Sequence, residues 1–178
     1  MWVSRLRRLG LITLPLVALV LGLTAAPANA DTDWYQITSK WSGKCMDLSD
    51  QEANSSFPHV QQWSCKNDVS NQQWSPVLQT NGTIELVSRR TGKCMSVDGD
   101  ATFAGALIVT ASCFTVDPSQ QWRFQTNPFP NASGSSWLVN GRSGKCVELP
   151  GWNTDNGLLL AQSDCVGGWK QYWNTIGL

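Results

Sequence analysis

The side chains of this 178-residue sequence with the clearest chemical signature are six cysteines and a single histidine, His59. Cysteines at regular spacing can form disulfides, bind zinc or supply a thiol nucleophile. A histidine-bearing zinc site is poorly supplied because there is only one histidine. No nucleophile motif lies beside His59, which argues against thiol or serine catalysis there. Disulfides are therefore the chemistry that the cysteines favour.

The cysteines lie in three copies of one sequence pattern. Each copy has a Ser/Thr-Gly-Lys-Cys segment, a second cysteine 19 or 20 residues later, and a closing Gln-x-Trp triplet. The copies contain Cys45, Cys65 and Gln72-Gln73-Trp74; Cys94, Cys113 and Gln120-Gln121-Trp122; and Cys146, Cys165 and Gln171-Tyr172-Trp173. Three concurrent matches at one period indicate a structural unit that is used three times.

The repetition also favours one disulfide pairing. Six cysteines allow fifteen connectivities. Repetition favours three bonds that are equivalent by symmetry, one inside each copy: Cys45–Cys65, Cys94–Cys113 and Cys146–Cys165. Each closed loop of this length should contribute roughly 3 kcal/mol to the free energy of unfolding.

The first thirty residues have the pattern of a secretory signal peptide. Arg5, Arg7 and Arg8 precede an apolar run over residues 9–26, and Ala28-Asn29-Ala30 supplies a small-x-small cleavage signal. We therefore expect residues 1–30 to be removed and the protein to be secreted. The alternative is a membrane anchor, but Pro15 interrupts the apolar run and the cleavage signal follows it directly. An exported chain with an even number of cysteines supports disulfides.

Charge and composition exclude several classes of function. The sequence has 13 basic and 13 acidic residues, and loss of the leader removes three arginines and leaves a net charge of −3. A nucleic-acid-binding protein needs a basic surface to meet phosphates, so we expect no nucleic acid partner. Hydrophobic residues make up 42% of the sequence, enough for a packed core. We expect no membrane span in the mature form.

Each copy contains short β-like segments and no long helical periodicity. Examples are residues 34–37, 84–87 and 137–139, and Asn81-Gly82 and Asn156-Gly157 are hairpin signals. Copies of about fifty residues cannot bury a core alone. We therefore expect one all-β domain over residues 31–178, with repeats at about 34–79, 84–127 and 137–178 packed around a shared axis.

These motifs resemble the ricin-B-type lectin domain, also called carbohydrate-binding module family 13. The resemblance covers essentially the whole mature chain. It implies a β-trefoil of three homologous repeats with one disulfide per repeat, in which six strands form a barrel and six cap it as hairpins. In that fold the Gln-x-Trp tryptophans (Trp74, Trp122 and Trp173) fill the core, and the glutamines satisfy backbone groups.

The resemblance also implies a sugar site in the first copy. Each copy of the family can supply an acid two residues after the first cysteine, a glutamine and an aromatic residue four and two before the second, and an Asn-Gln pair at the closing triplet. The first copy matches at every position, with Asp47, Gln61, Trp63, Asn71 and Gln72. An aromatic ring stacks on a sugar's apolar face, while carboxylate and amide groups bind its hydroxyls. Phe57-Pro58-His59 departs from the family pattern and alters the rim.

The other two copies depart from this pattern. The positions of Asp47, Gln61, Trp63 and Asn71 are occupied by Ser96, Val109, Ala111 and Ser119 in the second copy, and by Glu148, Ala161, Ser163 and Lys170 in the third. Asp98 offers partial compensation in the second copy. A third site outside the family pattern, built on Glu148 and Trp152, stays open as an alternative.

The sequence thus predicts a secreted carbohydrate-binding lectin or module. Galactose-type sugars suit the acid and the ring of the first copy in this family, and xylan- or arabinan-type polymers are the other choice. The alternative is a protein-interaction trefoil, such as a protease inhibitor, toxin subunit or adaptor. An enzyme is disfavoured, and we expect neither a cofactor nor a metal.

Overall fold

The computed structural model describes residues 33–126 and 134–178. The expected signal peptide, residues 1–30, lies outside the described residues. Within them the chain forms twelve short strands. These are β1 (Tyr35–Ser39), β2 (Cys45–Leu48), β3 (Val60–Trp63), β4 (Trp74–Leu78), β5 (Ile84–Ser88), β6 (Cys94–Val97), β7 (Ile108–Ala111), β8 (Trp122–Thr126), β9 (Ser136–Asn140), β10 (Cys146–Glu148), β11 (Ala161–Ser163) and β12 (Trp173–Gly177).

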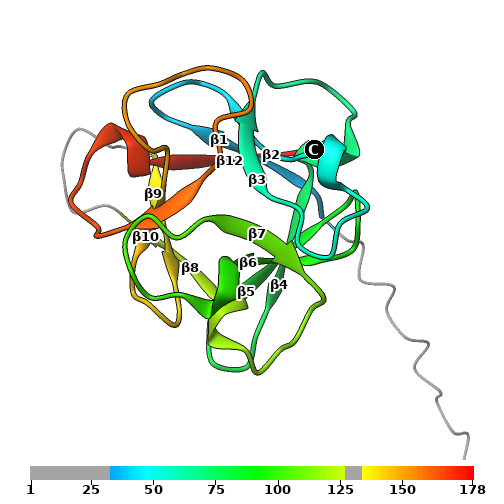
Figure 1. Cartoon of the computed structure of the whole chain (residues 1–178), viewed down its shortest axis with the longest axis vertical. Helices are drawn as coiled ribbons and strands as arrows, with labels where there is room; N and C mark the ends of the chain where they lie inside the picture. The colour runs from blue at the N-terminus through cyan, green and yellow to red at the C-terminus, as the bar shows by residue number, and fades with distance from the viewer. Residues whose placement is uncertain (1–32, 127–133) are drawn as a thin grey trace, which may run out of the picture. The chain divides into compact units, whose positions relative to one another are not determined.

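Six of the strands close into a barrel. β1 pairs with β12 and β4, β5 pairs with β4 and β8, and β9 pairs with β8 and β12, all antiparallel. Every one of these strands therefore has a neighbour on both sides, so the ring leaves no free edge. The remaining strands form three hairpins, β2–β3, β6–β7 and β10–β11. Figure 1 shows them arranged around the view axis.

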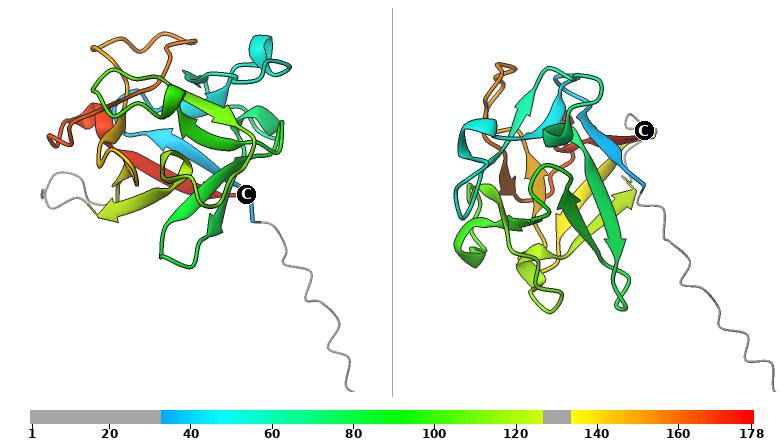
Figure 2. Two further views of the ribbon diagram at one scale, coloured as in Figure 1. Left: turned by 60° about the horizontal axis from the view of Figure 1, so that its bottom comes forward. Right: turned by 90° about the vertical axis from the view of Figure 1, so that its right-hand side faces the viewer.

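This arrangement is a β-trefoil of three repeats, each with four strands and one disulfide, and it confirms the predicted fold class. Seen from other directions, the hairpin loops gather at one end of the barrel (Figure 2). Short 3-10 helices precede the last strand of each repeat: η2 (Ser70–Gln72), η4 (Pro118–Gln120) and η6 (Trp169–Gln171). Among the described residues, no helix is long and apolar enough to cross a membrane.

The core repeats the threefold pattern layer by layer. Each repeat contributes an equivalent buried residue to every layer. The layers are Ile37, Leu86 and Leu138; Met46, Met95 and Val147; Leu48, Val97 and Leu149; Val60, Ile108 and Leu160; and Trp74, Trp122 and Trp173. Burying a side chain of this size contributes about 1.5–3 kcal/mol. The copies therefore share one core that no single copy could build.

The three tryptophans of the closing triplets are core residues, as predicted. All are essentially fully buried. Their indole Nε1 groups donate hydrogen bonds to backbone carbonyls of the second strand in the same repeat, at 3.2 Å for Trp74, 2.9 Å for Trp122 and 3.0 Å for Trp173. Each tryptophan therefore fixes the strand that carries the acid position of its repeat.

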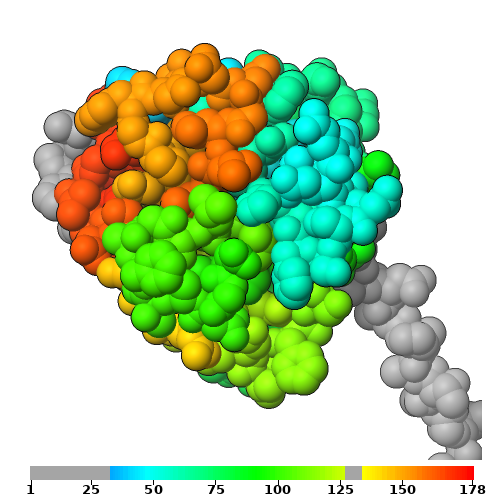
Figure 3. All heavy atoms as spheres, viewed as in Figure 1, coloured from blue at the N-terminus to red at the C-terminus, as the bar shows by residue number. Residues whose placement is uncertain are grey.

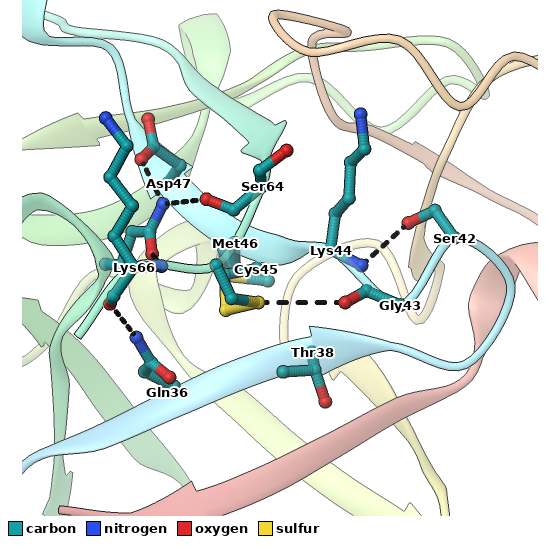
Figure 4. Close-up of a disulfide and its surroundings, with 12 residues drawn as sticks. Gln36, Thr38, Ser42, Gly43, Lys44, Cys45, Met46, Asp47, Ser64 and Lys66 are labelled. Carbon is teal, nitrogen blue, oxygen red and sulfur yellow. Dashed lines mark hydrogen bonds between the residues drawn. A yellow bond between two sulfur atoms is a disulfide. The ribbon is translucent and has the colours of Figure 1, made fainter.

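The predicted disulfides are all present. Cys45 is bonded to Cys65, Cys94 to Cys113 and Cys146 to Cys165. The first joins the start of β2 to the segment that follows β3 (Figure 4). In this way the disulfide closes the hairpin that holds the first-copy residues.

The glycine before each first cysteine has a conformational reason. Gly43, Gly92 and Gly144 have φ of 67°, 68° and 67°, which side chains other than glycine adopt at a cost. They turn the chain from the first strand of each repeat into the second. The positive φ thus explains the glycine of the Gly-Lys-Cys motif.

The hairpins also contact one another across the repeats. The long connection between β10 and β11, residues 149–160, runs beside β3, where the backbone N–H of Gln62 donates to Leu158 and Gly157 donates back to Gln62. Figure 3 shows the orange atoms of this region against the cyan atoms of the first repeat. Asn81-Gly82 does lie in the predicted turn between β4 and β5. Asn156-Gly157 also form a turn, within the connection that joins the paired strands β10 and β11. This connection is long, and the turn packs on the first repeat.

Candidate functional site

The first-repeat site begins with two residues paired across the β2–β3 hairpin. Asp47 and Gln61 are directly opposite in the antiparallel register. Side chains of such a pair point to the same face of the sheet. Gln61 Nε2 donates a hydrogen bond of 2.9 Å to Asp47 Oδ1. The hairpin therefore places a carboxylate and an amide side by side.

The short helix η2 brings two more amides to the same carboxylate. Asn71 Nδ2 and Gln72 Nε2 donate to Asp47 Oδ2 at 2.7 and 2.9 Å. The two oxygens of Asp47 thus accept three hydrogen bonds. A carboxylate has about four lone-pair sites, so it retains capacity for a further donor. The structure brings four of the predicted site residues together in this one network.

Gln72 differs from the others because it is fully buried. Its Oε1 accepts from the backbone N–H of Lys66 at 2.8 Å, and its Nε2 also donates to the Ser64 carbonyl at 3.1 Å. Gln120 and Gln171 make the same two kinds of backbone contact in the other repeats. Gln72 therefore holds the chain around the second cysteine and orients Asp47.

Asp47 is itself almost buried, with 2% of its surface exposed. Burial raises the pKa of its carboxyl above the ordinary value of 3.8, and the hydrogen bonds from Gln61 and Gln72 oppose this effect. Lys66 adds a smaller opposing attraction, and Figure 4 shows its side chain on the same side as Asp47. The group is thus a desolvated acceptor held by amides.

Trp63 lies two residues beyond Gln61 on the same face of β3, since side chains alternate along a strand. The two residues line a hollow of about 520 Å³ together with Asp47, Asn71 and Gln72. Trp63 is partly exposed. All five predicted site residues therefore border one cavity, which is lined by an aromatic ring and by the carboxylate-amide cluster.

One wall of the hollow comes from the third repeat, which sequence reasoning missed. Gly157 and Leu159 line the cavity. A Cβ built on Gly157 would lie 3.7 Å from the Trp63 ring. Asn156 Oδ1 accepts hydrogen bonds from the backbone N–H and hydroxyl of Ser64. The Asn-Gly signal at 156–157 pointed to a turn but carried no information about the repeat that it contacts.

The β2–β3 loop also borders the hollow, since η1 (Asp50–Glu52) is among the segments that line it. Glu52 Oε2 accepts from the backbone N–H of His59 at 2.8 Å and lies 2.6 Å from His59 Nδ1. The backbone hydrogen bond is the main cause of a lowered pKa for the Glu52 carboxyl. The single histidine therefore ties the two ends of the β2–β3 loop together through Glu52.

The second repeat keeps a hollow but lacks the amide network. Its cavity of about 620 Å³ is lined by Ser96, Val109 and Ala111 at the family positions. Phe57, from the loop of the first repeat, also lines it. Ser119 Oγ bonds Asp100 and Asp117 at 2.7 and 2.8 Å. The hollow thus has carboxylates and a ring, but not in the arrangement of the first repeat.

In the third repeat a lysine occupies the position of Asn71. Glu148 Oε2 accepts from Gln171 Nε2 at 3.1 Å, and its Oε1 lies 3.9 Å from Lys170 Nζ. Trp152 is exposed on the neighbouring loop. Among the described residues, only the first repeat combines the carboxylate, three amides and a hairpin ring around one hollow.

The family follows from comparison of the sequence with known domains. The model of the ricin-type β-trefoil lectin domain matches residues 33–173. The chain belongs to this family. Membership supports a carbohydrate-binding role, since the family is one of lectin domains. No curated protein sequence matches this ricin-type chain.

Solved structures agree with this fold. ThreeFoil, a designed threefold-symmetric protein, superimposes with a TM-score of 0.74 at 30% identity, over 82% of this chain and 99% of its own. The exo-β-1,3-galactanase of Clostridium thermocellum matches with a TM-score of 0.75 and 23% identity, over 84% of this chain but only 31% of that enzyme. The ricin B-like lectin of Macrolepiota procera, solved with lactose, matches with a TM-score of 0.66 and 18% identity, over 81% of this chain and 94% of that lectin. The latter two likenesses concern the fold alone.

Proposed function

We propose that this ricin-type domain binds glycans through the first-repeat hollow. The observation that carries the proposal is the convergence of Gln61, Asn71 and Gln72 on the carboxylate of Asp47, beside the ring of Trp63. Such a preorganised group of acceptors and donors costs little reorganisation when a ligand arrives.

Each side chain has a defined part in this proposal. Asp47 accepts a hydrogen bond from a sugar hydroxyl with its remaining lone pair. Gln61 and Asn71 each have a second N–H and an amide oxygen for neighbouring hydroxyls. Trp63 packs against the apolar C–H face of the ring. Gln72 is buried and orients Asp47 through its hydrogen bond to Oδ2, without touching the ligand.

Galactose-type sugars are the ligands we favour. An acceptor for adjacent hydroxyls on one side and an aromatic ring on the other suit a pyranose that has a polar and an apolar face. The lectin solved with lactose and a part of the galactanase, 31% of its chain, have the same fold, which supports the choice. Xylan- or arabinan-type polymers are the runner-up.

The proposed role is binding without turnover. One shallow hollow should give dissociation constants of roughly 0.1–1 mM, about 4–5.5 kcal/mol of binding free energy. Useful affinity then needs several copies of the glycan or of the domain.

We also propose that the protein acts outside the cell. The leader pattern of residues 1–30 and the three disulfides support export. The test is N-terminal sequencing of protein recovered from culture medium, which should begin at Asp31. Retention of the leader in membranes would contradict secretion.

A glycan array on the purified protein tests the function. It should bind galactose-terminated glycans, with competition by free galactose. Selective binding of xylan or arabinan would favour the runner-up. No binding to any glycan would favour the protein-interaction role.

A further inference from the structure

Two tryptophans from different repeats form an exposed corner. Trp41 lies in the turn between β1 and β2, and Trp152 in the loop between β10 and β11. Their ring centroids are 4.9 Å apart and the planes meet at 73°. The exposed fractions are 37% for Trp41 and 66% for Trp152. Two large rings thus keep substantial apolar area in water.

Charged groups hold this corner in place. Lys170 Nζ lies 5.4 Å from the centre of the Trp152 ring, a cation–π distance. The same Nζ lies 3.9 Å from Glu148 Oε1. The edge-to-face contact with Trp41 also favours one ring orientation. The rings are therefore preorganised, and a donor and an acceptor lie next to them.

The corner is distinct from the position at which a repeat of this family presents its ring. In the third repeat that position is Ser163, on β11. Trp152 comes from the preceding loop, and Trp41 belongs to the first repeat. Lys170 already engages the carboxylate of Glu148, the counterpart of Asp47. A ligand would therefore pack on the outer ring surfaces and meet Lys170 and Glu148 as a preformed pair.

The corner and the first-repeat hollow share one loop of the third repeat. The loop that carries Trp152 also carries Gly157 and Leu159, which line the hollow. Between them, Asn156 Oδ1 accepts a hydrogen bond of 2.6 Å from Lys44 Nζ, in the segment that follows Trp41. Trp152 and Gly157 are five residues apart, so their separation is at most about 18 Å. One short glycan can reach both places.

We propose that Trp41 and Trp152 form a second subsite, which binds a further sugar unit of the chain whose end occupies the first-repeat hollow. The proposal rests on the function proposed above and adds its ligand class, an oligosaccharide. The C–H face of the distal pyranose packs on Trp152, and its hydroxyls meet Lys170 and Glu148.

The experiment measures how affinity depends on chain length. Galactose and linear β-linked galactose di-, tetra- and hexasaccharides are titrated into the wild-type protein, Trp152→Ala and Trp41→Ala. Phe114→Ala is the matched control, since Phe114 is 65% exposed in the second repeat. Thermal unfolding verifies that each variant folds.

The wild-type protein should bind the hexasaccharide about three- to tenfold more tightly than galactose, the range of one aromatic contact. Trp152→Ala should abolish this preference and leave galactose affinity unchanged, and Trp41→Ala should reduce the preference. Phe114→Ala should behave as wild type. An equal preference in wild type and Trp152→Ala would overturn the subsite.

Asp47→Ala separates the two proposals. It should lose galactose and most hexasaccharide binding. Hexasaccharide binding that survives in Asp47→Ala and depends on Trp152 would reveal an independent site. It would overturn the proposal that one oligosaccharide occupies the hollow and the second subsite together. Absence of galactose binding by the wild-type protein would contradict the proposed function and, with it, this subsite.

Discussion

Gln61 donates a hydrogen bond of 2.9 Å to Asp47 from the residue paired directly opposite in the β2–β3 hairpin. The same register places Ser96 opposite Val109 in the second repeat and Glu148 opposite Ala161 in the third. The backbone therefore offers three equivalent places, and side-chain identity alone makes the first different. The trefoil fold repeats this cross-strand position three times, and only the first repeat places a carboxylate opposite an amide there.

The first prediction concerns pH. In the proposed site, sugar binding needs the ionised form of Asp47, and burial raises the pKa of this group above 3.8. Affinity for galactose should therefore be constant near neutral pH and fall at a higher pH than an ordinary aspartate would give. Titration calorimetry between pH 7 and pH 3 measures the midpoint. A midpoint below 3.8 would contradict the desolvated carboxylate.

Stability should respond differently to the same acidification. A raised folded-state pKa means that Asp47 favours folding most when protonated, so this group's contribution does not fall as pH decreases. Glu52 has a lowered pKa, and its contribution is lost as the pH falls through that folded-state value, below 4.5. Thermal unfolding should therefore show a retained fold at the pH where binding first weakens. Loss of sugar binding and of the folded state at the same pH would indicate acid unfolding instead.

A second prediction separates support from recognition with equivalent glutamines. Gln72→Ala removes bonds to Lys66, Ser64 and Asp47, and should cost about 3–5 kcal/mol of unfolding free energy because buried groups lose their partners. It should also weaken galactose binding at least about tenfold, since Asp47 loses one of its three donors.

The matched control is Gln120→Ala, which breaks the corresponding backbone contacts in the second repeat. It should lower stability by about 2–4 kcal/mol and leave galactose affinity unchanged. Urea unfolding and calorimetry give the two quantities. Equal loss of affinity in both variants would show that the effect is general destabilisation.

A third prediction concerns the disulfides. Replacing Cys94 and Cys113 together by alanine should lower the free energy of unfolding by about 3 kcal/mol, without affecting the first-repeat hollow. Replacing Cys45 and Cys65 should cost a similar amount and also weaken sugar binding, because this bond closes the hairpin of Asp47 and Gln61. If replacing Cys94 and Cys113 also reduced sugar affinity, the sugar site would depend on the disulfide of another repeat, which would contradict this prediction.

Much of the fold could be predicted from repetition. The cysteine spacing favoured three equivalent bonds, and the family resemblance implied that Trp74, Trp122 and Trp173 are core residues. These features are local within a copy, so the sequence reports them directly. The resemblance to the family implied all five first-repeat residues, and the structure places them around one cavity.

Contacts between repeats could not be predicted in the same way. Asn156 and Gly157 looked like a local turn, yet they pack on Ser64 and Trp63 of another repeat. Trp41 and Trp152 are 111 positions apart in the sequence, and no spacing rule brings them together. Such contacts depend on how three copies close around an axis, which is a property of the assembled barrel.

The most direct test of the central claim is calorimetric titration of galactose into wild type, Asp47→Ala and Trp63→Ala, with Ser96→Ala as the matched control in the second repeat. We expect binding by wild type and Ser96→Ala with similar affinity, and a loss of at least about tenfold in each first-repeat variant. Wild-type affinity in both first-repeat variants would contradict the assignment of the sugar site to the first repeat.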